Sequence, residues 1–294
     1  MADNQFPAGQ AAAQGSREPV RGGTTSPTAA IVVACRDTAA REVLSQELRK
    51  RYGADYHIVV CDQPAELGSR IKDLLAAGTP VALVIGGVGA QDPDGIEVLA
   101  APLPLTSFAE DTAAVERTLE RASGPVVLAG HAYAGAVIAA ARNQNVKALV
   151  YVAALAPDEG ETVADVFYRT KPHPLAPKLA PDNHGLIYLP DEAFAAAFAQ
   201  NASADELALL RAVQRPLSPA CITVPVNRPL WKDRPTWFLI AEQDRMIVHD
   251  TQRFMAERMH ARVRSHPVDH APIVTAPGLV VDIIREAIGE ALSG

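Results

Sequence analysis

Several features that mark particular classes of protein are scarce or missing in this chain of 294 residues. There are only three cysteines, Cys35, Cys61 and Cys221, and they form no C-x-x-C pair, so neither a disulfide framework nor a zinc site is indicated. The 27 basic residues are outnumbered by 34 acidic ones and form no Lys/Arg-rich run, which argues against nucleic-acid binding. No Gly-rich loop is followed by Lys-Ser or Lys-Thr, so a nucleotide-phosphate site is not expected.

Long apolar runs are missing as well. None reaches the roughly 20 residues that a membrane-spanning helix needs, so no membrane partner is expected. Residues 1–28 lack the apolar core of a secretory signal and are rich in Gly, Ala, Gln, Pro and Ser. Such a segment buries too little apolar surface to offset its ordering entropy, so we expect a disordered tail there. These features predict a cytoplasmic protein in which Cys35 and Cys61 are core residues.

From residue 29 onward, short apolar runs typical of buried strands alternate with helical patterns. In the first helical stretch, Leu44, Leu48 and Tyr52 lie four residues apart, and Gly53 follows as a stop signal. Buried strands separated by helices are typical of a parallel sheet that helices cover on both faces. We therefore predict an α/β fold with one continuous, doubly wound and mainly parallel sheet. The expected strands are 29–35, 56–61, 80–87, 126–130, 146–155, 236–241 and 261–268.

The segment 157–234 interrupts this alternation. It is rich in proline, and one of its helical runs begins with the capping-box pattern Ser203-x-x-Glu206. An insertion that follows the C-terminal edge of a strand, where ligands bind in such sheets, predicts a cap over a pocket. After this cap, Arg253 and Arg258 lie on an amphipathic helix over 249–259 and are expected to face solvent.

The sharpest local signal is LAGHAYAGAVI, residues 128–138. An apolar strand runs into Gly130-His131-Ala132-Tyr133-Ala134-Gly135, and small helical residues follow directly. This is the strand–turn–helix context of the nucleophile elbow, G-x-S-x-G, whose strained turn needs small flanking residues. The alternative is an ordinary strand-to-helix junction, where glycine is also common. In the elbow interpretation, Ala132 occupies the position of the nucleophilic serine, and His131 packs under the turn.

Two downstream residues strengthen the elbow interpretation. Asp244 follows the predicted strand TWFLIA, and His270 follows the strand ARVRSHPV. The chain order of elbow, acid and histidine is the order expected of an α/β hydrolase. In such a set the carboxylate fixes the tautomer of the imidazole, and the imidazole acts as the base. His266 and Asp269 lie close to His270 in the chain and either tune its pKa or are ordinary loop residues.

Three stretches of the chain resemble the α/β-hydrolase superfamily, in particular the group of small esterases and hydroxynitrile lyases. They are the run from LPLTSF to GHAYAGAVI, the run ALVYVAALAPDEGETVADVF, and WFLIAEQDRMI with the later VDHAPIVTAP. The resemblance covers about 96–290 and implies catalytic positions at Ala132, Asp244 and His270, with the backbone N–H of Tyr133 in the oxyanion hole. It also implies a cap after the strand equivalent to the family's sixth. The chain departs from the family at Ala132, where the family has serine, and at Ala134, where it usually has glycine. Two departures favour natural divergence over a single engineered change.

The first hundred residues do not carry the family's His-Gly oxyanion loop. Residues 30–99 instead resemble half of a two-component receiver domain, notably in LRKRYGADYHIVV and PVALVIGGVGAQDPDGIEVL. The phospho-acceptor of a receiver would fall at Gly87, and its acidic pair would fall at Cys35 and Arg36, leaving only Asp37. We therefore expect a receiver-like half over 29–95, unable to accept phosphate, followed by a hydrolase-like half over 96–294 with its cap at about 157–234.

Three functions remain open at this point. The first is an impaired or non-canonical hydrolase that acts on a small ester-like or carbonyl substrate through His270 and Asp244. The second is a catalytically inactive pseudoenzyme that binds a small molecule, and the third is a regulatory protein. The retained pair of Asp244 and His270 favours the first, whereas the loss of the serine favours the others. None of the three requires a metal or an organic cofactor.

Overall fold

The computed structural model describes residues 29–34, 38–54, 56–62, 66–77, 79, 81–86, 90–91 and 96–292. The chain divides into two compact units, Met1–Val98 and Leu99–Gly294, close to the junction predicted near residue 96. The predicted tail over 1–28 lies outside the described residues. No helix in the described part of the chain is long and apolar enough to cross a membrane.

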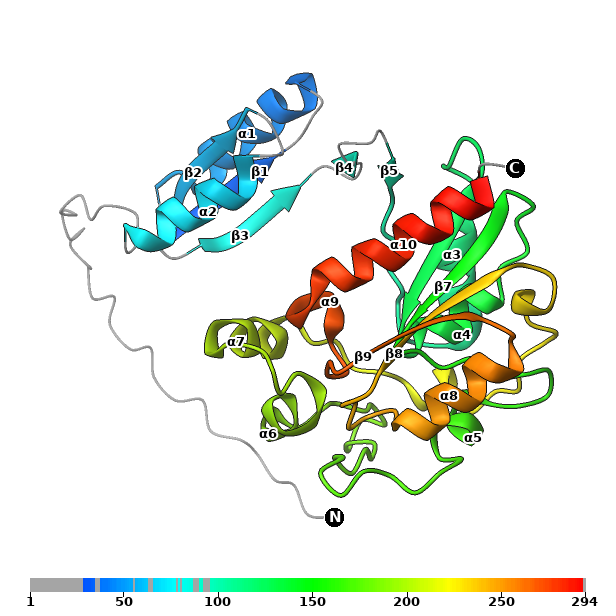
Figure 1. The fold of residues 1–294 in the computed structure, drawn as a ribbon. Coiled ribbons are helices and arrows are strands. Elements are labelled where there is room, and N and C mark those ends of the chain that lie inside the picture. Colours follow the sequence, from blue (N-terminus) through cyan, green and yellow to red (C-terminus); the bar gives the residue numbers. More distant parts are fainter. Residues whose placement is uncertain are drawn as a thin grey trace, which may run out of the picture. The chain divides into compact units, whose positions relative to one another are not determined.

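The N-terminal unit contains a small parallel sheet with strand order β2-β1-β3 (Figure 1). Leu48 of the first helix is buried and packs with Leu44 against Ile31, Val33 and Ile58 of the sheet, as the four-residue spacing predicts. Cys61 is fully buried, as expected. The elements are β1 (Ala29–Ala34), α1 (Thr38–Tyr52), β2 (Tyr56–Cys61), α2 (Leu67–Ala76), β3 (Val81–Gly86), β4 (Ala90–Gln91) and β5 (Glu97–Val98), the last two forming an antiparallel pair.

The C-terminal unit holds a four-stranded parallel sheet in the order β6-β7-β8-β9. Its strands are β6 (Val126–His131), β7 (Val146–Val152), β8 (Thr236–Ala241) and β9 (Arg262–His266). In the described residues, β1, β2 and β3 pair with one another in the N-terminal unit, and β6, β7, β8 and β9 pair with one another in the C-terminal unit. One continuous sheet across the two units stays a prediction. Apolar runs indicate that strands are buried in parallel sheets, but they do not encode which strand pairs with which.

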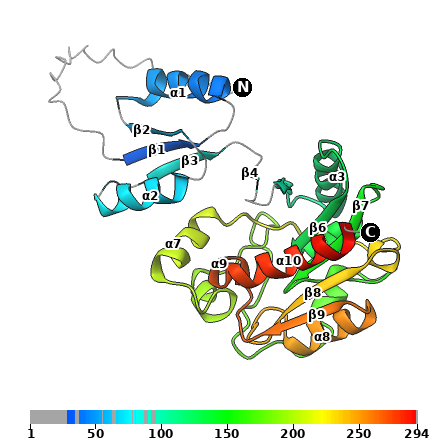
Figure 2. The same cartoon turned by 45° about the horizontal axis from the view of Figure 1, so that its top comes forward.

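Helices cover both faces of the C-terminal sheet (Figure 2). On one face α3 (Phe108–Leu119), α4 (Ala134–Ala139) and α8 (His249–Arg258) pack on a core that includes Leu149, Tyr151 and Phe238. On the other face α10 (Pro277–Leu292), preceded by α9 (Pro272–Thr275), buries Val280, Ile283 and Ala287 against a core that includes Val150, Trp237 and Leu239. Ile284 packs against the same core, so these residues form the face that α10 turns to the sheet.

The segment between β7 and β8 is the insertion that the sequence assigns to a cap over 157–234. Ser203 and Glu206 form the predicted capping box at the start of the cap helix α7, and Thr162 and Asp165 form another at α5. The elements of this segment are α5 (Val163–Phe167), α6 (Asp191–Ala193), a π-helical turn (Phe194–Phe198), α7 (Ala204–Val213) and 3₁₀ turns at Pro219–Cys221 and Leu230–Lys232.

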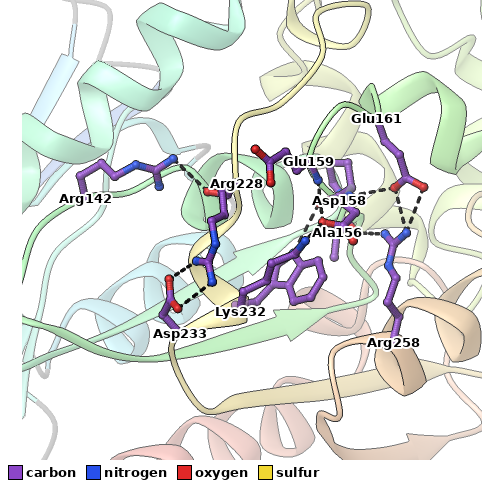
Figure 3. Close-up of polar contacts among 11 residues, drawn as sticks. Arg142, Ala156, Asp158, Glu159, Glu161, Arg228, Lys232, Asp233 and Arg258 are labelled. Atoms are coloured by element: carbon purple, nitrogen blue, oxygen red, sulfur yellow. Dashed lines mark hydrogen bonds and ion pairs between the residues drawn. The ribbon is translucent and has the colours of Figure 1, made fainter.

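The chain enters the cap after β7 and returns from it before β8. Polar contacts join these two segments to each other and to α8 (Figure 3). Gly160 N–H donates to the Val226 carbonyl at 3.0 Å, and Lys232 pairs with Asp158 at 2.5 Å. From α8, the Arg258 guanidinium donates to both Glu161 carboxylate oxygens, at 2.9 and 3.0 Å. The cap is therefore fixed at its base by a cluster of ion pairs and backbone hydrogen bonds.

Arg258 corrects an expectation from the sequence. Its side chain is only 18% exposed, whereas that of Arg253 is 59% exposed and faces solvent as predicted. The Arg258 guanidinium also donates to the Ala156 carbonyl at 2.6 Å and lies 4.9 Å from the ring centroid of Phe254. The periodicity of α8 cannot reveal this burial, because the partner Glu161 lies 97 residues away in the chain.

These two arginines provide a matched test of the cap base. We expect Arg258→Ala to lower the free energy of unfolding by about 2–3 kcal/mol. It removes two charged hydrogen bonds to Glu161, which keeps only the Asp158 N–H as a donor, and it removes the side-chain donor to the Ala156 carbonyl. Arg253→Ala should change it by less than about 0.5 kcal/mol, because an exposed ion pair contributes little. Urea denaturation of both variants measures the difference. Equal effects of the two substitutions would contradict a stabilising role for the cluster.

Candidate active site

The turn between β6 and α4 has the geometry of a strained elbow. Ala132 has a φ of 51°, in the left-handed region that residues with a Cβ rarely adopt. Its carbonyl accepts hydrogen bonds from Gly135 N–H at 3.2 Å and from Leu155 N–H at 2.9 Å. The turn is thus held to the segment that follows β7. This conformation favours the elbow interpretation over an ordinary strand-to-helix junction.

The glycines flanking the turn are required by close backbone approach. A Cβ at Gly130 would lie 2.8 Å from the Ala134 carbonyl group, and one at Gly135 would lie 2.5 Å from the Leu155 carbonyl oxygen. Real Cβ atoms do not come so close to backbone atoms. The predicted need for small residues at these two positions therefore has a direct steric cause.

We expect Gly135→Ala to destabilise the protein by about 2–3 kcal/mol, because the rigid backbone at Leu155 cannot move away from the new methyl group. Gly278→Ala is the matched control, since a Cβ at this helical position meets nothing within 4 Å. That control should be neutral or stabilising by up to about 1 kcal/mol. Thermal denaturation of both variants checks this, and a neutral Gly135→Ala would show that the elbow is not sterically constrained.

The structure brings His270 and Asp244 together. His270 Nδ1 lies 2.7 Å from Asp244 Oδ2, and both side chains are almost completely buried. Because a carboxylate at neutral pH only accepts, Nδ1 carries the hydrogen and Nε2 is left with a lone pair. An imidazole held in this tautomer is ready to accept a proton.

Asp244 is held by three further donors. Met246 and Ile247 donate their backbone N–H groups to Oδ1 at 2.7 and 2.8 Å, and Gln252 donates its side-chain amide to Oδ2 at 2.9 Å. Gln252 is fully buried, and its amide oxygen accepts from Ala241 N–H at 3.0 Å. These contacts compensate the burial of the carboxylate and fix its orientation. Sequence reasoning missed Gln252, which is an ordinary polar position in the helical pattern of α8.

His131 lies beside His270 and is partly buried. Its Nε2 donates to the His270 backbone carbonyl at 2.6 Å, and the two imidazole centroids are 4.8 Å apart. Phe198 of the cap completes an aromatic cluster, with its centroid 5.1 Å from that of His270. Burial, and then the nearby charge of His270, lower the pKa of His131 from 6.5 to about 3. His131 therefore stays neutral at physiological pH and acts as a fixed donor.

A pH dependence of stability follows from this lowered pKa. The unfolded chain protonates His131 below about pH 6.5, whereas the folded protein keeps it neutral down to about pH 3. The unfolded state thus binds more protons in this window, and stability falls as the pH falls, by up to about 1.4 kcal/mol per pH unit from this group. We expect His131→Gln, which retains a donor, to have a shallower slope of unfolding free energy between pH 6.5 and 3. Parallel curves for the two proteins would contradict the assignment.

A cavity of about 160 Å³ opens between the strand ends and the cap. Ala132 and His270 both line it, as do Leu155, Met246 and Ile247 from the loops after β7 and β8. The cap contributes apolar walls, among them Val163, Phe167, Leu179, Leu217 and Ile222. Among the described residues that line the cavity, the polar groups belong to His270 and two tyrosines, Tyr133 and Tyr168, and none is an acidic or basic side chain other than the histidine. The site therefore fits a small, uncharged and largely apolar molecule.

Tyr133 carries the backbone N–H that the family resemblance assigns to the oxyanion hole. It follows Ala132 directly and precedes the first residue of α4, where backbone N–H groups have no partner within the helix. Its own N–H makes no hydrogen bond to any residue that the structure describes. Burial, and next its hydrogen bond to Asp111, raise the pKa of the Tyr133 hydroxyl, so this group stays protonated.

The cap is fastened to both loops that carry the acid–base pair. The Asp269 carboxylate is fully buried. It accepts a hydrogen bond from the backbone N–H of the cap residue Asn201 at 2.9 Å and another from the Thr275 hydroxyl at 2.6 Å. Beside Asp244, Gln200 of the cap donates to the Gln243 carbonyl at 2.7 Å. Asp269 is thus a structural anchor of the cap.

The predictions about receiver chemistry concern residues that the structure does not describe. The positions predicted for receiver chemistry, Cys35, Arg36, Asp37 and Gly87, lie outside the described residues. Within the described ranges, no group of three or more His, Cys, Asp or Glu side chains is placed to hold a metal ion.

Several solved structures have a similar fold. The chain has the fold of polyneuridine aldehyde esterase, with a TM-score of 0.54 at 14% identity over 88% of this chain and 98% of that one. It is also similar to a pyrethroid hydrolase from Sphingobium faniae JZ-2, with a TM-score of 0.51 at 18% identity over 90% and 98% of the chains. An extracellular alpha/beta-hydrolase from a Paenibacillus species gives a TM-score of 0.51 at 17% identity over 88% and 98%.

A search of the curated proteins finds no significant match. The sequence pattern of the alpha/beta hydrolase family matches residues 42–283, which extends further toward the N-terminus than the resemblance over 96–290 predicts. The receiver-like resemblance of residues 29–95 stays a prediction. Because the family pattern spans most of the chain, this protein belongs to the alpha/beta hydrolase family.

Proposed function

We propose that the protein is a non-canonical hydrolase that cleaves small, uncharged, apolar esters by general-base catalysis, without a covalent intermediate. The observation that carries this proposal is the 2.7 Å contact between His270 and Asp244, made by an imidazole that lines the same apolar cavity as Ala132. A poised imidazole within reach of the reacting group is sufficient for base catalysis. The hydrolase fold itself is common to many unrelated reactions, so the argument rests on the site.

The chemistry would proceed in two steps. His270 Nε2 takes a proton from a water molecule, whose oxygen bonds to the carbonyl carbon of the ester, and the carbonyl electron pair moves onto its oxygen. The resulting oxyanion accepts a hydrogen bond from the Tyr133 N–H. The intermediate then collapses, the bond to the alcohol oxygen breaks, and the imidazolium returns its proton to the leaving alcohol. Asp244 stabilises the imidazolium throughout.

Such an enzyme should be slow. Triad enzymes that lack their serine retain about 10³–10⁴-fold acceleration over water, from binding and the oxyanion hole. Ala132 supplies no nucleophile but leaves room beside His270, since both residues line the cavity and an alanine side chain is one methyl group. The cavity walls favour acyl groups without charge, because no lysine or arginine stands among the described lining residues to pair with a carboxylate.

The test is hydrolysis of neutral p-nitrophenyl esters by the wild type and by His270→Ala. We expect hydrolysis above the buffer rate by the wild type, and a loss of that excess in the variant. A charged ester of the same length should be hydrolysed more slowly than the neutral one. An excess rate that persists in a folded His270→Ala protein would refute the proposed function.

The main alternative is a catalytically inactive protein that binds a small molecule in the same cavity. It is favoured by one specific observation, namely that Ala132 is accommodated in the strained elbow while the cap still encloses an apolar cavity. A binding protein needs the cavity but does not need His270 as a base. Ligand affinity that is insensitive to His270→Ala, in a protein without esterase activity, would support this alternative.

A further inference from the structure

Asp111 is a buried carboxylate outside the acid–base pair. It lies in the first turn of α3 and is fully buried, which for an acidic side chain is costly unless its oxygens are hydrogen-bonded. The N-terminal end of a helix also favours a negative charge. Neither the elbow nor the pair of His270 and Asp244 includes this residue, so its burial needs another explanation.

Three donors from three parts of the chain converge on Asp111. The Tyr133 hydroxyl donates to Oδ2 at 2.7 Å, and the Leu105 backbone N–H donates to Oδ1 at 2.7 Å. The thiol of Cys221, in the returning segment of the cap, lies 3.6 Å from Oδ2. Burial raises the pKa of this thiol to about 11, so it keeps its hydrogen at neutral pH. Asp111 thus links the elbow, the segment before α3 and the cap.

The contacts of Asp111 lead to the cavity through Tyr133 and through the residue next to Cys221. Tyr133 lines the cavity, and so does Ile222, which follows Cys221 directly. Leu105 has a φ of 63°, and both of its backbone polar groups are hydrogen-bonded. Its N–H donates to Asp111, and its carbonyl accepts from the Ser218 N–H of the cap at 2.9 Å. A change in the position of the Asp111 carboxylate would therefore reach the residue next to Ala132.

We propose that Asp111 is the positioning residue of the elbow, and that by holding the Tyr133 side chain it sets the direction of the Tyr133 backbone N–H that binds the carbonyl oxygen of the substrate. The inference rests on the proposed function, in which this N–H polarises that carbonyl. Asp111 itself does not line the cavity and acts only through Tyr133.

A purely structural role would have a different signature. If Asp111 served only to hold the strained Leu105, then removal of the Tyr133 hydroxyl would leave its function intact. If it positions the elbow, Asp111→Asn and Tyr133→Phe should have the same effect on a bound carbonyl, and the double variant should add little. Cys221→Ser is the matched control, because it touches the same carboxylate, keeps a donor and leaves Tyr133 unchanged.

The experiment uses acetophenone, a neutral aromatic ketone, as the probe of the site. Binding is measured by calorimetry, and the carbonyl stretch of the bound ketone by infrared difference spectroscopy. In the wild type and in Cys221→Ser we expect the stretch at lower frequency than in hydrocarbon, because the Tyr133 N–H donates to the oxygen. In Asp111→Asn and in Tyr133→Phe the stretch should move back toward the hydrocarbon value, with affinity about fivefold weaker.

A second readout needs no ligand. In protein labelled with ¹⁵N-tyrosine, the Tyr133 amide resonance, identified by its loss in Tyr133→Phe, should shift in Asp111→Asn and stay in place in Cys221→Ser. If acetophenone shows no carbonyl shift in the wild type, the proposed function fails, while this resonance still tests the positioning. An unchanged Tyr133 resonance in folded Asp111→Asn would overturn the inference, as would a normal carbonyl shift in Tyr133→Phe.

Discussion

Ala132→Ser should create an esterase at least about 100-fold faster than the wild type on small p-nitrophenyl esters. The new hydroxyl would face the cavity that Ala132 lines, beside the imidazole of His270. A serine needs only an adjacent base to become a nucleophile, and covalent catalysis divides one difficult step into two easier ones. Initial rates of p-nitrophenol release measure the gain.

The control for this gain is the double variant Ala132→Ser with His270→Ala. It should lose the added rate completely, because no other base reaches the new hydroxyl among the described residues that line the cavity. A folded Ala132→Ser protein with no gain would mean that the elbow no longer presents position 132 to the base. The binding alternative would then be the better account of the site.

The second large effect concerns the acid. In the Ala132→Ser protein, Asp244→Asn should lower kcat by about 10³–10⁴-fold while KM changes little. An asparagine can donate to Nδ1 and so stabilises the wrong tautomer, and it cannot stabilise the imidazolium. Gln252→Leu, which removes the side-chain donor to Asp244 but keeps the carboxylate, should have a much smaller effect on kcat. Steady-state kinetics of the two variants separate the effect of the Asp244 charge from that of the Gln252 hydrogen bond. Equal decreases in kcat would contradict the assigned role of Asp244.

The elbow and the acid–base pair could be predicted from the sequence because their signals are local. Gly130 is required by backbone contacts within the turn, and such steric demands limit residue type. Gly135 is required by the Leu155 carbonyl after β7, but the sequence shows it as part of the same local elbow pattern. Asp244 and His270 lie in the loops that follow β8 and β9, and the ends of parallel strands meet at one edge of a sheet. The spacing alone therefore predicts that these residues lie near Ala132.

The supporting residues could not be predicted, because their partners are distant in the chain. Asp111 meets Cys221 across 110 residues, and Arg258 meets Glu161 across 97. Helical periodicity marks a polar residue as exposed unless a partner is known, so the pattern assigns Arg258 to solvent. Tertiary contacts override this local pattern.

The N-terminal strands illustrate a different limit. Short apolar runs such as those of β1 and β2 fit any doubly wound sheet, so they resemble a receiver domain as readily as a hydrolase. The alpha/beta hydrolase pattern begins at residue 42, inside the region that the sequence assigns to a receiver-like half. Which strands share a sheet is likewise a property of tertiary pairing, and the expected continuous sheet rests on the strand runs alone.

The central claim, that His270 acts as a base on the substrate without a covalent intermediate, is tested most directly by stopped-flow measurement of p-nitrophenol release from a neutral ester at high protein concentration. For the wild type the account predicts a linear, His270-dependent release without an initial burst, and for Ala132→Ser a burst that approaches one equivalent per site. A stoichiometric burst in the wild type, or a linear rate that His270→Ala leaves unchanged, would contradict it.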